Sequence, residues 1–336
     1  MKKISFFWTV ILLLSNLFVI SYPQSVLANG AEFSVVAILP ENQKTKNISY
    51  FDFELLPNNE QTIEVEITNG NIKREKTYVV DLNTATTNMN GIIDYTEQNK
   101  EKDESLQISI AEIATFDKDI TIPAGGTSRV PITLKMPDEK FDGILLGGIT
   151  VMEVDENDSK EQNQIKNRFS YSIGVVLSQG DINPSIELNF LGVDMSQINR
   201  RSVISGNIQN SAATVINDLS LDAKIYRKGS RKPMFKRSEV GLRMAPNSNF
   251  DFGVETNDQP LKAGTYQMDI LASVGENEWF WTKEFEVSTK KAKELNETAI
   301  GLEKNSTIKY LYIAIGLLGT IFIIVILLVF YTKPKE

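Results

Sequence analysis

The chain has 336 residues and a formal net charge of −8 at pH 7, from 35 Lys and Arg against 43 Asp and Glu. This acidic balance argues against nucleic-acid binding. The chain has no cysteine and no histidine, which excludes Cys–His and Ser–His–Asp catalytic arrangements and zinc sites of the usual kind. The lack of cysteine also excludes the disulfides that a secreted eukaryotic ectodomain of this size usually carries.

A secretory signal peptide is predicted at the N-terminus. Two lysines precede an apolar run over residues 4–20, and Val26 and Ala28 supply the small residues of a cleavage site. A retained N-terminal anchor is the alternative, and the clear cleavage region argues against it. Residues 1–28 are therefore expected to be removed on export.

The pattern of residues 31–180 predicts a first β-sandwich. Alternation of apolar and polar residues with period two, which is typical of half-buried strands, recurs in three segments: 61–70, 105–113 and 128–137. The polar stretch 153–167 is interpreted as a long hairpin loop, because a further strand pattern follows it at 168–179. A family boundary inside this loop stays open. The loop lacks the glycine and the final glutamate of an EF-hand, so a solvated loop is expected, with a loose surface cation site as the alternative.

A glycine-rich segment, KFDGILLGGITV (140–151), lies within this sandwich. It lacks the Lys-Ser/Thr of a phosphate-binding loop, and its uncharged part is too short to cross a membrane. We expect a buried strand, with Gly147 and Gly148 marking a bulge or a close backbone approach. Five apolar residues are expected to pack the sandwich: Ile144, Leu145, Leu146, Ile149 and Val151.

The loop over residues 83–100 is a candidate glycan contact. It is rich in Thr and Asn and includes a tyrosine, and such groups can satisfy sugar hydroxyls and the amides of peptide stems. The candidate residues are Thr86, Asn88, Asn90 and Tyr95. The alternative is a polar loop that satisfies its own hydrogen bonds.

Residues 181–288 predict a second β-sandwich. Seven strand patterns separated by short turns match the strand count of an immunoglobulin-like domain. In the last of them Trp279, Trp281 and Phe285 share one face, and we interpret this face as core and not as a sugar-stacking platform.

A basic cluster interrupts this second half at YRKGSRKPMFKR, where glycine and proline suggest a hairpin tip. Six cations in an acidic protein predict contact with a polyanion, such as teichoic acid or an acidic protein partner. A solvated loop whose charge aids solubility is the alternative. The six residues are Arg227, Lys228, Arg231, Lys232, Lys236 and Arg237.

The C-terminal part predicts a stalk and an anchor. Residues 289–308 have apolar residues at helical spacing, which indicates a short amphipathic helix that serves as a spacer. Residues 309–332 contain an uncharged apolar run flanked by tyrosines, long enough for one transmembrane helix, and 333–336 form a lysine-containing cytoplasmic tail. These features predict an all-β, type I single-pass protein in the membrane of a Gram-positive bacterium, with its ectodomain in the cell envelope.

Several segments resemble the WxL-interacting cell-surface proteins of Gram-positive bacteria. Those in the first half are FSVVAILPENQ (33–43), SYFDFELLPNNEQTIEVEITN (49–69), ATTNMNGIIDY (85–95) and KMPDEKFDGILLGGI (135–149). Those in the second half are NDLSLDAKIYRKGS (217–230), MAPNSNFDF (244–252), LKAGTYQMDI (261–270) and WFWTKEFEV (279–287). The resemblance covers nearly the whole mature chain, in the same order.

This resemblance implies a first domain that binds peptidoglycan and a second that binds host or matrix proteins, in a protein that assembles with WxL-domain surface proteins. It implies no catalytic motif and no cofactor. We therefore expect a non-enzymatic, membrane-anchored adhesion or adaptor protein, whose partners are a wall polymer and a WxL-type or host protein. The alternatives are a sensor that acts with a membrane partner and a carboxylate-based wall hydrolase.

Overall fold

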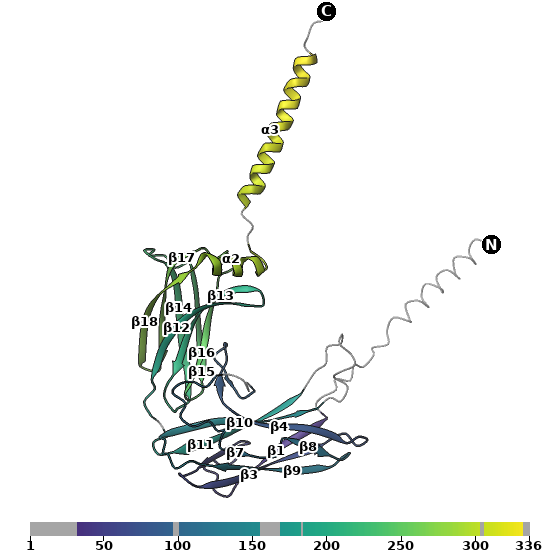
Figure 1. Ribbon diagram of the computed structural model, residues 1–336, viewed down its shortest axis with the longest axis vertical. Helices are drawn as coiled ribbons and strands as arrows, with labels where there is room; N and C mark the ends of the chain where they lie inside the picture. Colours follow the sequence, from purple (N-terminus) through teal and green to yellow (C-terminus); the bar gives the residue numbers. More distant parts are fainter. Residues whose placement is uncertain (1–31, 97–100, 155–168, 183, 303–305, 332–336) are drawn as a thin grey trace, which may run out of the picture.

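The computed structural model describes residues 32–96, 101–154, 169–182, 184–302 and 306–331. The predicted signal peptide and cytoplasmic tail, and most of the polar loop 153–167, lie outside these residues. Two β-sandwiches are set at an angle to one another, and both described helices lie at the end of the second sandwich that points away from the first (Figure 1). The prediction of a mostly β chain is confirmed.

The first sandwich consists of a four-stranded sheet, β1–β3–β9–β7, and a five-stranded sheet, β2–β11–β10–β4–β8. All neighbours are antiparallel except the parallel pair β2 and β11. A separate two-stranded hairpin, β5–β6, projects from it. The strands are β1 (Phe33–Ile38), β2 (Phe51–Glu54), β3 (Glu60–Asn69), β4 (Lys76–Thr84), β5 (Thr86–Thr87), β6 (Ile93–Asp94), β7 (Ala114–Thr115), β8 (Asp119–Ile122), β9 (Thr127–Lys135), β10 (Gly143–Glu153) and β11 (Ser170–Gln179).

The alternation predicted for two of the three segments is confirmed, and the third prediction is wrong. Inward residues of β3 and β9, such as Ile63 and Ile132, are buried between the sheets, while their neighbours in sequence face solvent. The segment 105–113 forms no strand. Its backbone is instead folded by turns in which Leu106 N donates to Asp103 O and Glu112 N donates to Ser109 O.

The glycines of β10 permit close packing and do not form a bulge, because the register with both neighbours is continuous. A Cβ on Gly147 would lie 2.4 Å from Cγ2 of Ile110, and one on Gly148 would lie 2.5 Å from Cγ of Tyr95. The expected close approach is therefore confirmed. Leu145, Ile149 and Val151 enter the core as predicted.

Ile144 and Leu146 were wrongly predicted to pack inside the sandwich. Alternation along β10 places them on the opposite face, where they contact Ala85 and Ala245 in a small apolar cluster between the two sandwiches. This outer face of the sheet is therefore covered by other parts of the protein.

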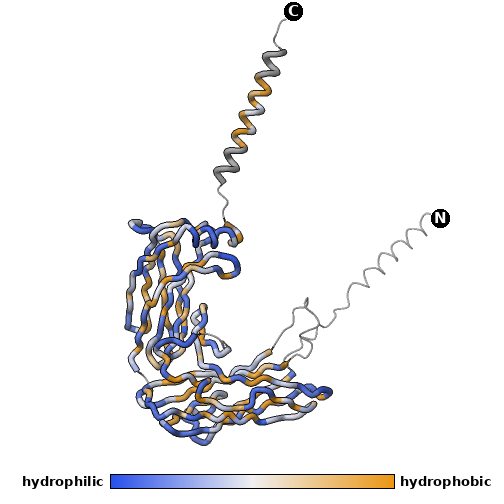
Figure 2. Tube along the Cα trace, viewed as in Figure 1, coloured by the Kyte–Doolittle hydropathy of each residue, from blue (hydrophilic) through white to orange (hydrophobic). Residues whose placement is uncertain are grey.

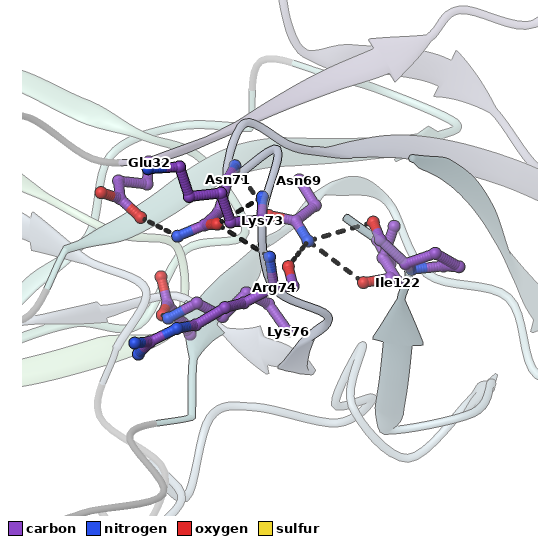
Figure 3. Close-up of polar contacts among 9 residues, drawn as sticks. Glu32, Asn69, Asn71, Lys73, Arg74, Lys76 and Ile122 are labelled. Carbon is purple, nitrogen blue, oxygen red and sulfur yellow. Dashed lines mark hydrogen bonds and ion pairs between the residues drawn. The ribbon is translucent and has the colours of Figure 1, made fainter. Parts of the chain in front are cut away.

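A buried asparagine fixes the turn after β3, as Figure 3 shows. The amide of Asn69 donates to the carbonyls of Arg74, Ile122 and Pro123, at 2.9–3.1 Å. Asn210 occupies the corresponding position, as the last residue of β13 in the second sandwich, and donates to Thr214 O and Ala245 O. Both side chains are fully buried, so each sandwich uses an internal amide to satisfy backbone carbonyls that water cannot reach.

The second sandwich consists of a three-stranded sheet, β12–β13–β16, and a four-stranded sheet, β15–β14–β17–β18. All seven predicted strands form, and Trp279, Trp281 and Phe285 pack against the core as expected. Apolar residues follow the strands of both sandwiches, while the turns are mainly hydrophilic (Figure 2). The strands are β12 (Leu188–Ile198), β13 (Arg201–Asn210), β14 (Ile216–Arg227), β15 (Phe235–Met244), β16 (Ser248–Glu255), β17 (Gly264–Val274) and β18 (Asn277–Val287).

Helix α2 (Thr289–Thr298) forms within the predicted stalk but packs on the second sandwich. The Ser288 hydroxyl caps its N-terminus by accepting from Lys291 N. Ala292 and Leu295 are buried in the core of the second sandwich, and the Gln197 side chain donates to Leu295 O at 2.6 Å. The helix is therefore part of this domain and not a free spacer.

Helix α3 (Ser306–Tyr331) follows. Within the described part of the chain, no helix meets the length and apolarity required to cross a membrane. The transmembrane helix at 309–332 accordingly stays a prediction.

Replacing Leu295 with alanine tests the packing of α2. We expect Leu295→Ala to lower the free energy of unfolding of the second sandwich by about 2–5 kcal/mol, because it leaves a cavity in the core. Once residues 1–28 are removed, the remaining tryptophans are Trp279 and Trp281, so denaturation followed by tryptophan fluorescence reports on this sandwich. The exposed Lys293→Ala, the control, should change stability by no more than about 0.5 kcal/mol. Equal stability of both variants would show that α2 is not part of the folded domain.

Candidate functional site

The two sandwiches are joined by a network of hydrogen bonds at the junction between them. The β5–β6 hairpin reaches from the first sandwich to strands β15 and β16 of the second (Figure 1). Ala245 N donates to the Thr87 hydroxyl at 3.0 Å, and this hydroxyl lies 2.7 Å from that of Ser248. Arg243 N donates to Gly91 O at 2.7 Å. These bonds join the domains through backbone as well as side chains.

Two glycines allow this close approach. Gly91, at the hairpin tip, has a φ of +65°, and a Cβ there would lie 2.7 Å from Cδ2 of Leu242. Gly143, at the start of β10, has a φ of +124°, and a Cβ there would lie 2.3 Å from Ala213 O. Larger residues would be strained by backbone conformation and by contact with the second sandwich.

A buried carboxylate, that of Asp103, organises the polar part of the junction. It belongs to the irregular segment of the first sandwich and is 7% exposed. Two amides of the second sandwich donate to it, Gln209 Nε2 at 2.8 Å and Asn249 Nδ2 at 2.5 Å. Ser105 donates to it from both its backbone N and its hydroxyl. The carboxylate is therefore satisfied by groups from both domains.

These donors control the ionisation of Asp103. Burial alone would raise the pKa of the carboxyl, but the hydrogen bonds from Asn249, Ser105 and Gln209 favour the charged form and hold the pKa below its usual range. Asp103 is consequently ionised at neutral pH and attracts the amide dipoles of the opposite domain.

Asn247 provides a second polar link. Its backbone has a φ of +46°, which asparagine tolerates better than most residues. Its side-chain amide donates to Ser105 O of the first sandwich at 3.1 Å and to Ser211 O of the second at 2.9 Å. One side chain thereby satisfies carbonyls from both domains.

Two cavities flank the irregular segment at this junction. One, of about 250 Å³, is lined by Asn83, Asp103 and Asn249 among others, and the other, of about 230 Å³, lies beside Phe141 and Ser211. Asn247 lines both. In the first cavity Asp103 and the hydroxyls of Thr84 and Ser109 already bond to protein groups, so its polar lining serves mainly to join the domains.

The four residues predicted to contact glycan differ in their exposure and in their hydrogen bonds. Thr86 lies in β5 and is half-buried, and Asn88 accepts hydrogen bonds from the N–H groups of Asn90 and Ile92 within its own hairpin. Tyr95 packs over Gly148, and burial raises the pKa of its hydroxyl. Only Asn90 is exposed. Glycan contact by these residues stays a prediction.

The structure places the six cations of the basic cluster in two different locations. Arg227, Lys228, Arg231 and Lys232 are exposed around the β14–β15 turn, and we call these four the basic tip. Lys228 Nζ pairs with Glu284 at 2.7 Å. The other two cations, Lys236 and Arg237, lie on β15.

Arg237 has a clear structural role. Its guanidinium lies over the ring of Phe252, 4.4 Å from the centroid, and donates to Gly253 O at 2.9 Å. It also contacts Glu239 at 3.3 Å. The side chain therefore bridges the open edges of β15 and β16.

A third cavity, a groove of about 440 Å³, brings Asn90 together with Lys236 and Arg237. We call it the β15–β16 groove; its other lining residues are Met89, Ile198, Val203, Glu239, Gly253, Glu255 and Asn257. Sequence reasoning missed it because its residues come from both domains and from strands that show no shared motif. Among the described residues, no group of three or more acidic side chains is placed to hold a metal ion.

The family of the protein is shown by two domain models. Residues 33–153 match the model described as WxL Interacting Protein, peptidoglycan binding domain, and residues 160–297 match WxL Interacting Protein, host binding domain. The chain belongs to the WxL interacting protein family, which confirms the resemblance. The first range ends at residue 153 and the second begins at residue 160. Strand β11 falls within the second range, although it pairs with β10 of the first sandwich. The predicted boundary at residue 180 stays a prediction.

Similarity to solved structures is low. The YadV chaperone has 10% identity and a TM-score of 0.30, with 76% of this chain and all of that chain covered. The E. coli chaperone DraB has 14% identity and a TM-score of 0.27, with 76% and 97% covered. A family 123 glycoside hydrolase from Clostridium perfringens has 11% identity and a TM-score of 0.28, with 46% and 28% covered. Such TM-scores establish neither domain arrangement nor function. No curated protein matches the chain closely enough to count as a relative.

Substituting Asp103 tests the junction. We expect Asp103→Asn to destabilise the protein by roughly 1–3 kcal/mol at pH 7, because the amides of Gln209 and Asn249 lose a charged acceptor. Since the folded pKa is lowered, the wild type should keep this stabilisation above the usual Asp pKa and lose it as the pH falls through the folded value. Thermal unfolding measured from pH 7 downward checks both.

The control for this experiment is the exposed Asp194, changed in Asp194→Asn. That variant should keep both the stability and the acid dependence of the wild type. If Asp103→Asn behaved in the same way, the carboxylate would not be holding the domains together.

Proposed function

We propose that the protein is a non-enzymatic cell-surface adaptor that binds peptidoglycan through its first sandwich and a WxL-type surface protein through its second. The observation that carries this proposal is the match of both binding-domain models, in order, over most of the chain. Both models describe binding and neither describes a catalytic activity. Wall polymer and protein partner would then be held by one molecule.

The junction supports an adaptor role. Asp103, Asn247 and the β5–β6 hairpin tie the domains by polar bonds from both sides, and an apolar cluster covers the face between them. Domains joined in this way keep a set angle, in contrast to domains separated by a flexible linker. A fixed angle would orient the bound partner relative to the wall.

Membrane anchoring through residues 309–332 is part of the proposal and rests on the sequence, in which residues 310–332 carry no charge. With the anchor at the C-terminus, the second sandwich lies nearest the membrane and the first lies toward the wall. A host protein would have to cross the wall to reach the second sandwich. We therefore favour a bacterial WxL-type protein over a host matrix protein as its partner.

The basic tip is proposed to contact wall polyanions. The turn between β14 and β15, which carries these cations, lies at the end of the second sandwich away from the junction. Lys228 is paired with Glu284, which leaves Arg227, Arg231 and Lys232 as the stronger candidates. Exposed charges of this kind are screened by salt, so such contact should weaken as ionic strength rises.

Co-sedimentation with purified sacculi tests the proposed function. We expect the protein to pellet with sacculi whether or not teichoic acid has been removed, because the first sandwich binds peptidoglycan itself. No soluble muropeptides should be released, as chromatography of the supernatant will show. Changing the four cations of the basic tip to glutamine should reduce only the salt-sensitive binding that depends on teichoic acid. Failure to pellet would contradict peptidoglycan binding, and muropeptide release would identify a hydrolase.

A further inference from the structure

We propose that the end of the second sandwich away from the junction rests on the anionic lipid headgroups of the membrane. Four segments make up this end, which we call the basic end: residues 199–201 at the β12–β13 turn, 227–234 at the β14–β15 turn, the loop 256–263, and helix α2. The inference rests on the membrane anchoring proposed above and adds a contact that the folded domain itself makes.

Hydrogen bonds join these four segments into one continuous surface. Arg200 Nε donates to Thr298 O of α2 at 3.3 Å. Asn296 of α2 exchanges two hydrogen bonds with the backbone of the loop, at 2.8 and 2.9 Å. Arg227 Nη2 donates to Ala263 O of the same loop at 3.5 Å, which connects the basic tip to the loop and to α2. The cations of the four segments therefore belong to one surface.

The basic end has an excess of positive charge, although the whole chain has a net charge of −8. Each carboxylate within the four segments is paired with a cation of the same surface. The pairs are Asp258 with Arg201, Glu294 with Lys291, and Glu297 with Lys293, at 3.7–3.9 Å. Lys228 is paired with Glu284 of β18. Negative charge at the basic end is thus already neutralised within the domain.

The remaining cations of the basic end are accessible. All of them are exposed and have no ion pair with any described residue. These six cations are Arg200, Arg227, Arg231, Lys232, Lys262 and Lys290. Two exposed carboxylates at neighbouring strand ends, Glu255 and Glu286, reduce the excess of positive charge without reversing it.

The chain itself places this surface beside the membrane. Ile300 N donates to Arg200 O at 2.9 Å, and a Cβ on Gly301 would lie 3.1 Å from Oδ1 of Asp258. The chain is therefore held against the basic end as far as Gly301. Helix α3 begins at Ser306 (Figure 1), and the five peptide units between Gly301 and Ser306 span at most about 18 Å.

This short connection brings lipid headgroups within reach. The uncharged run begins at residue 310, one helical turn after α3 starts, which adds about 6 Å. The basic end of an anchored chain then lies at most about 24 Å from the hydrocarbon core, and headgroups occupy roughly the first 5–7 Å of this distance. An anionic membrane attracts cations within about one Debye length, near 8 Å at physiological ionic strength. The connection therefore holds the cations close to the zone of attraction.

A membrane suits the basic end better than a soluble polyanion does. The cations come from four segments and extend across the end of the domain, which matches a broad surface. The anchor also keeps the membrane at a high effective concentration on this side of the domain. The basic tip belongs to the same surface, so teichoic acid and lipid phosphate would compete for its cations. Because the junction fixes the angle between the domains, this contact would also set the tilt of the first sandwich above the membrane.

Energy transfer from the full-length protein to labelled vesicles tests the proposal. The chain has no cysteine, so Gln259→Cys places one donor fluorophore at an exposed position of the basic end. The acceptor is attached to lipid headgroups at a constant density. We expect transfer to be about twofold stronger in vesicles rich in phosphatidylglycerol than in phosphatidylcholine vesicles, because only the former attract the cations. High salt should remove the difference by screening.

Two charge variants make the test specific to the basic end. Changing Arg231, Lys232, Lys262 and Lys290 to glutamine should abolish the difference between the two kinds of vesicle. The matched control, in which Lys46, Lys73, Lys135 and Lys140 of the first sandwich become glutamine, should retain it. All eight residues are exposed, so thermal unfolding should show that both variants fold like the wild type.

Equal transfer in the two kinds of vesicle would overturn the membrane contact, and so would a difference that persists in the basic-end variant. Flotation of the same vesicles separates this contact from the anchor. A protein that floats with phosphatidylcholine vesicles after a high-salt wash but shows equal transfer is anchored without the contact. In that case, salt-sensitive binding to teichoic acid would assign the cations to the polymer alone. Flotation only with phosphatidylglycerol vesicles, reversed by salt, would support the contact and contradict the anchor. Flotation with neither would contradict both.

Discussion

The buried carboxylate of Asp103 is the interaction on which the arrangement of this protein depends. A charge removed from water is tolerated only when hydrogen bonds replace its hydration. Here the replacements come from Gln209 and Asn249 of the other domain. If the domains separated, these donors would be lost and water would have to replace them. The junction is consequently a specific polar contact with a defined geometry, in addition to the small apolar cluster around Leu146.

Other features of the fold lead to the same junction. The glycines of β10 let Ile110 and Tyr95 pack against the two faces of the strand, which positions the irregular segment that carries Asp103 and the hairpin that carries Gly91. Asn210 fixes the turn after β13 from within, and this turn supplies Ala213, whose carbonyl accepts from Ile144 N of the first sandwich. Elements that stabilise each domain internally therefore also shape the surfaces by which they meet.

Much of the fold could be predicted from the sequence, because period-two alternation reports directly which side of a strand is buried. It identified all seven strands of the second sandwich. The same pattern failed at residues 105–113, where Leu106, Ile108 and Ile110 alternate but the backbone follows turns. It also misassigned Ile144 and Leu146, because alternation cannot tell solvent from a second domain on the outer face of a sheet.

The candidate sites were less predictable than the fold. The basic cluster is contiguous in sequence, yet Arg237 is occupied by Phe252 and Gly253. The polar loop 83–100 was selected as a glycan contact, whereas Asn88 and Tyr95 are used within the first sandwich and its hairpin. The β15–β16 groove joins Met89 and Asn90 to residues more than a hundred positions away. Such a juxtaposition depends on domain docking, which no local pattern encodes.

The central claim is that the junction holds the two sandwiches at one angle. The most direct test is to measure the distance between the sandwiches in solution. The chain has no cysteine. A double variant, Lys135→Cys in β9 and Glu278→Cys in β18, therefore carries one spin label at an exposed position of each sandwich. Pulsed electron–electron double resonance at neutral pH should give one narrow distance distribution, centred on the separation of these positions in the structure. A broad distribution, or several populations, would show that the sandwiches move independently and would contradict the account.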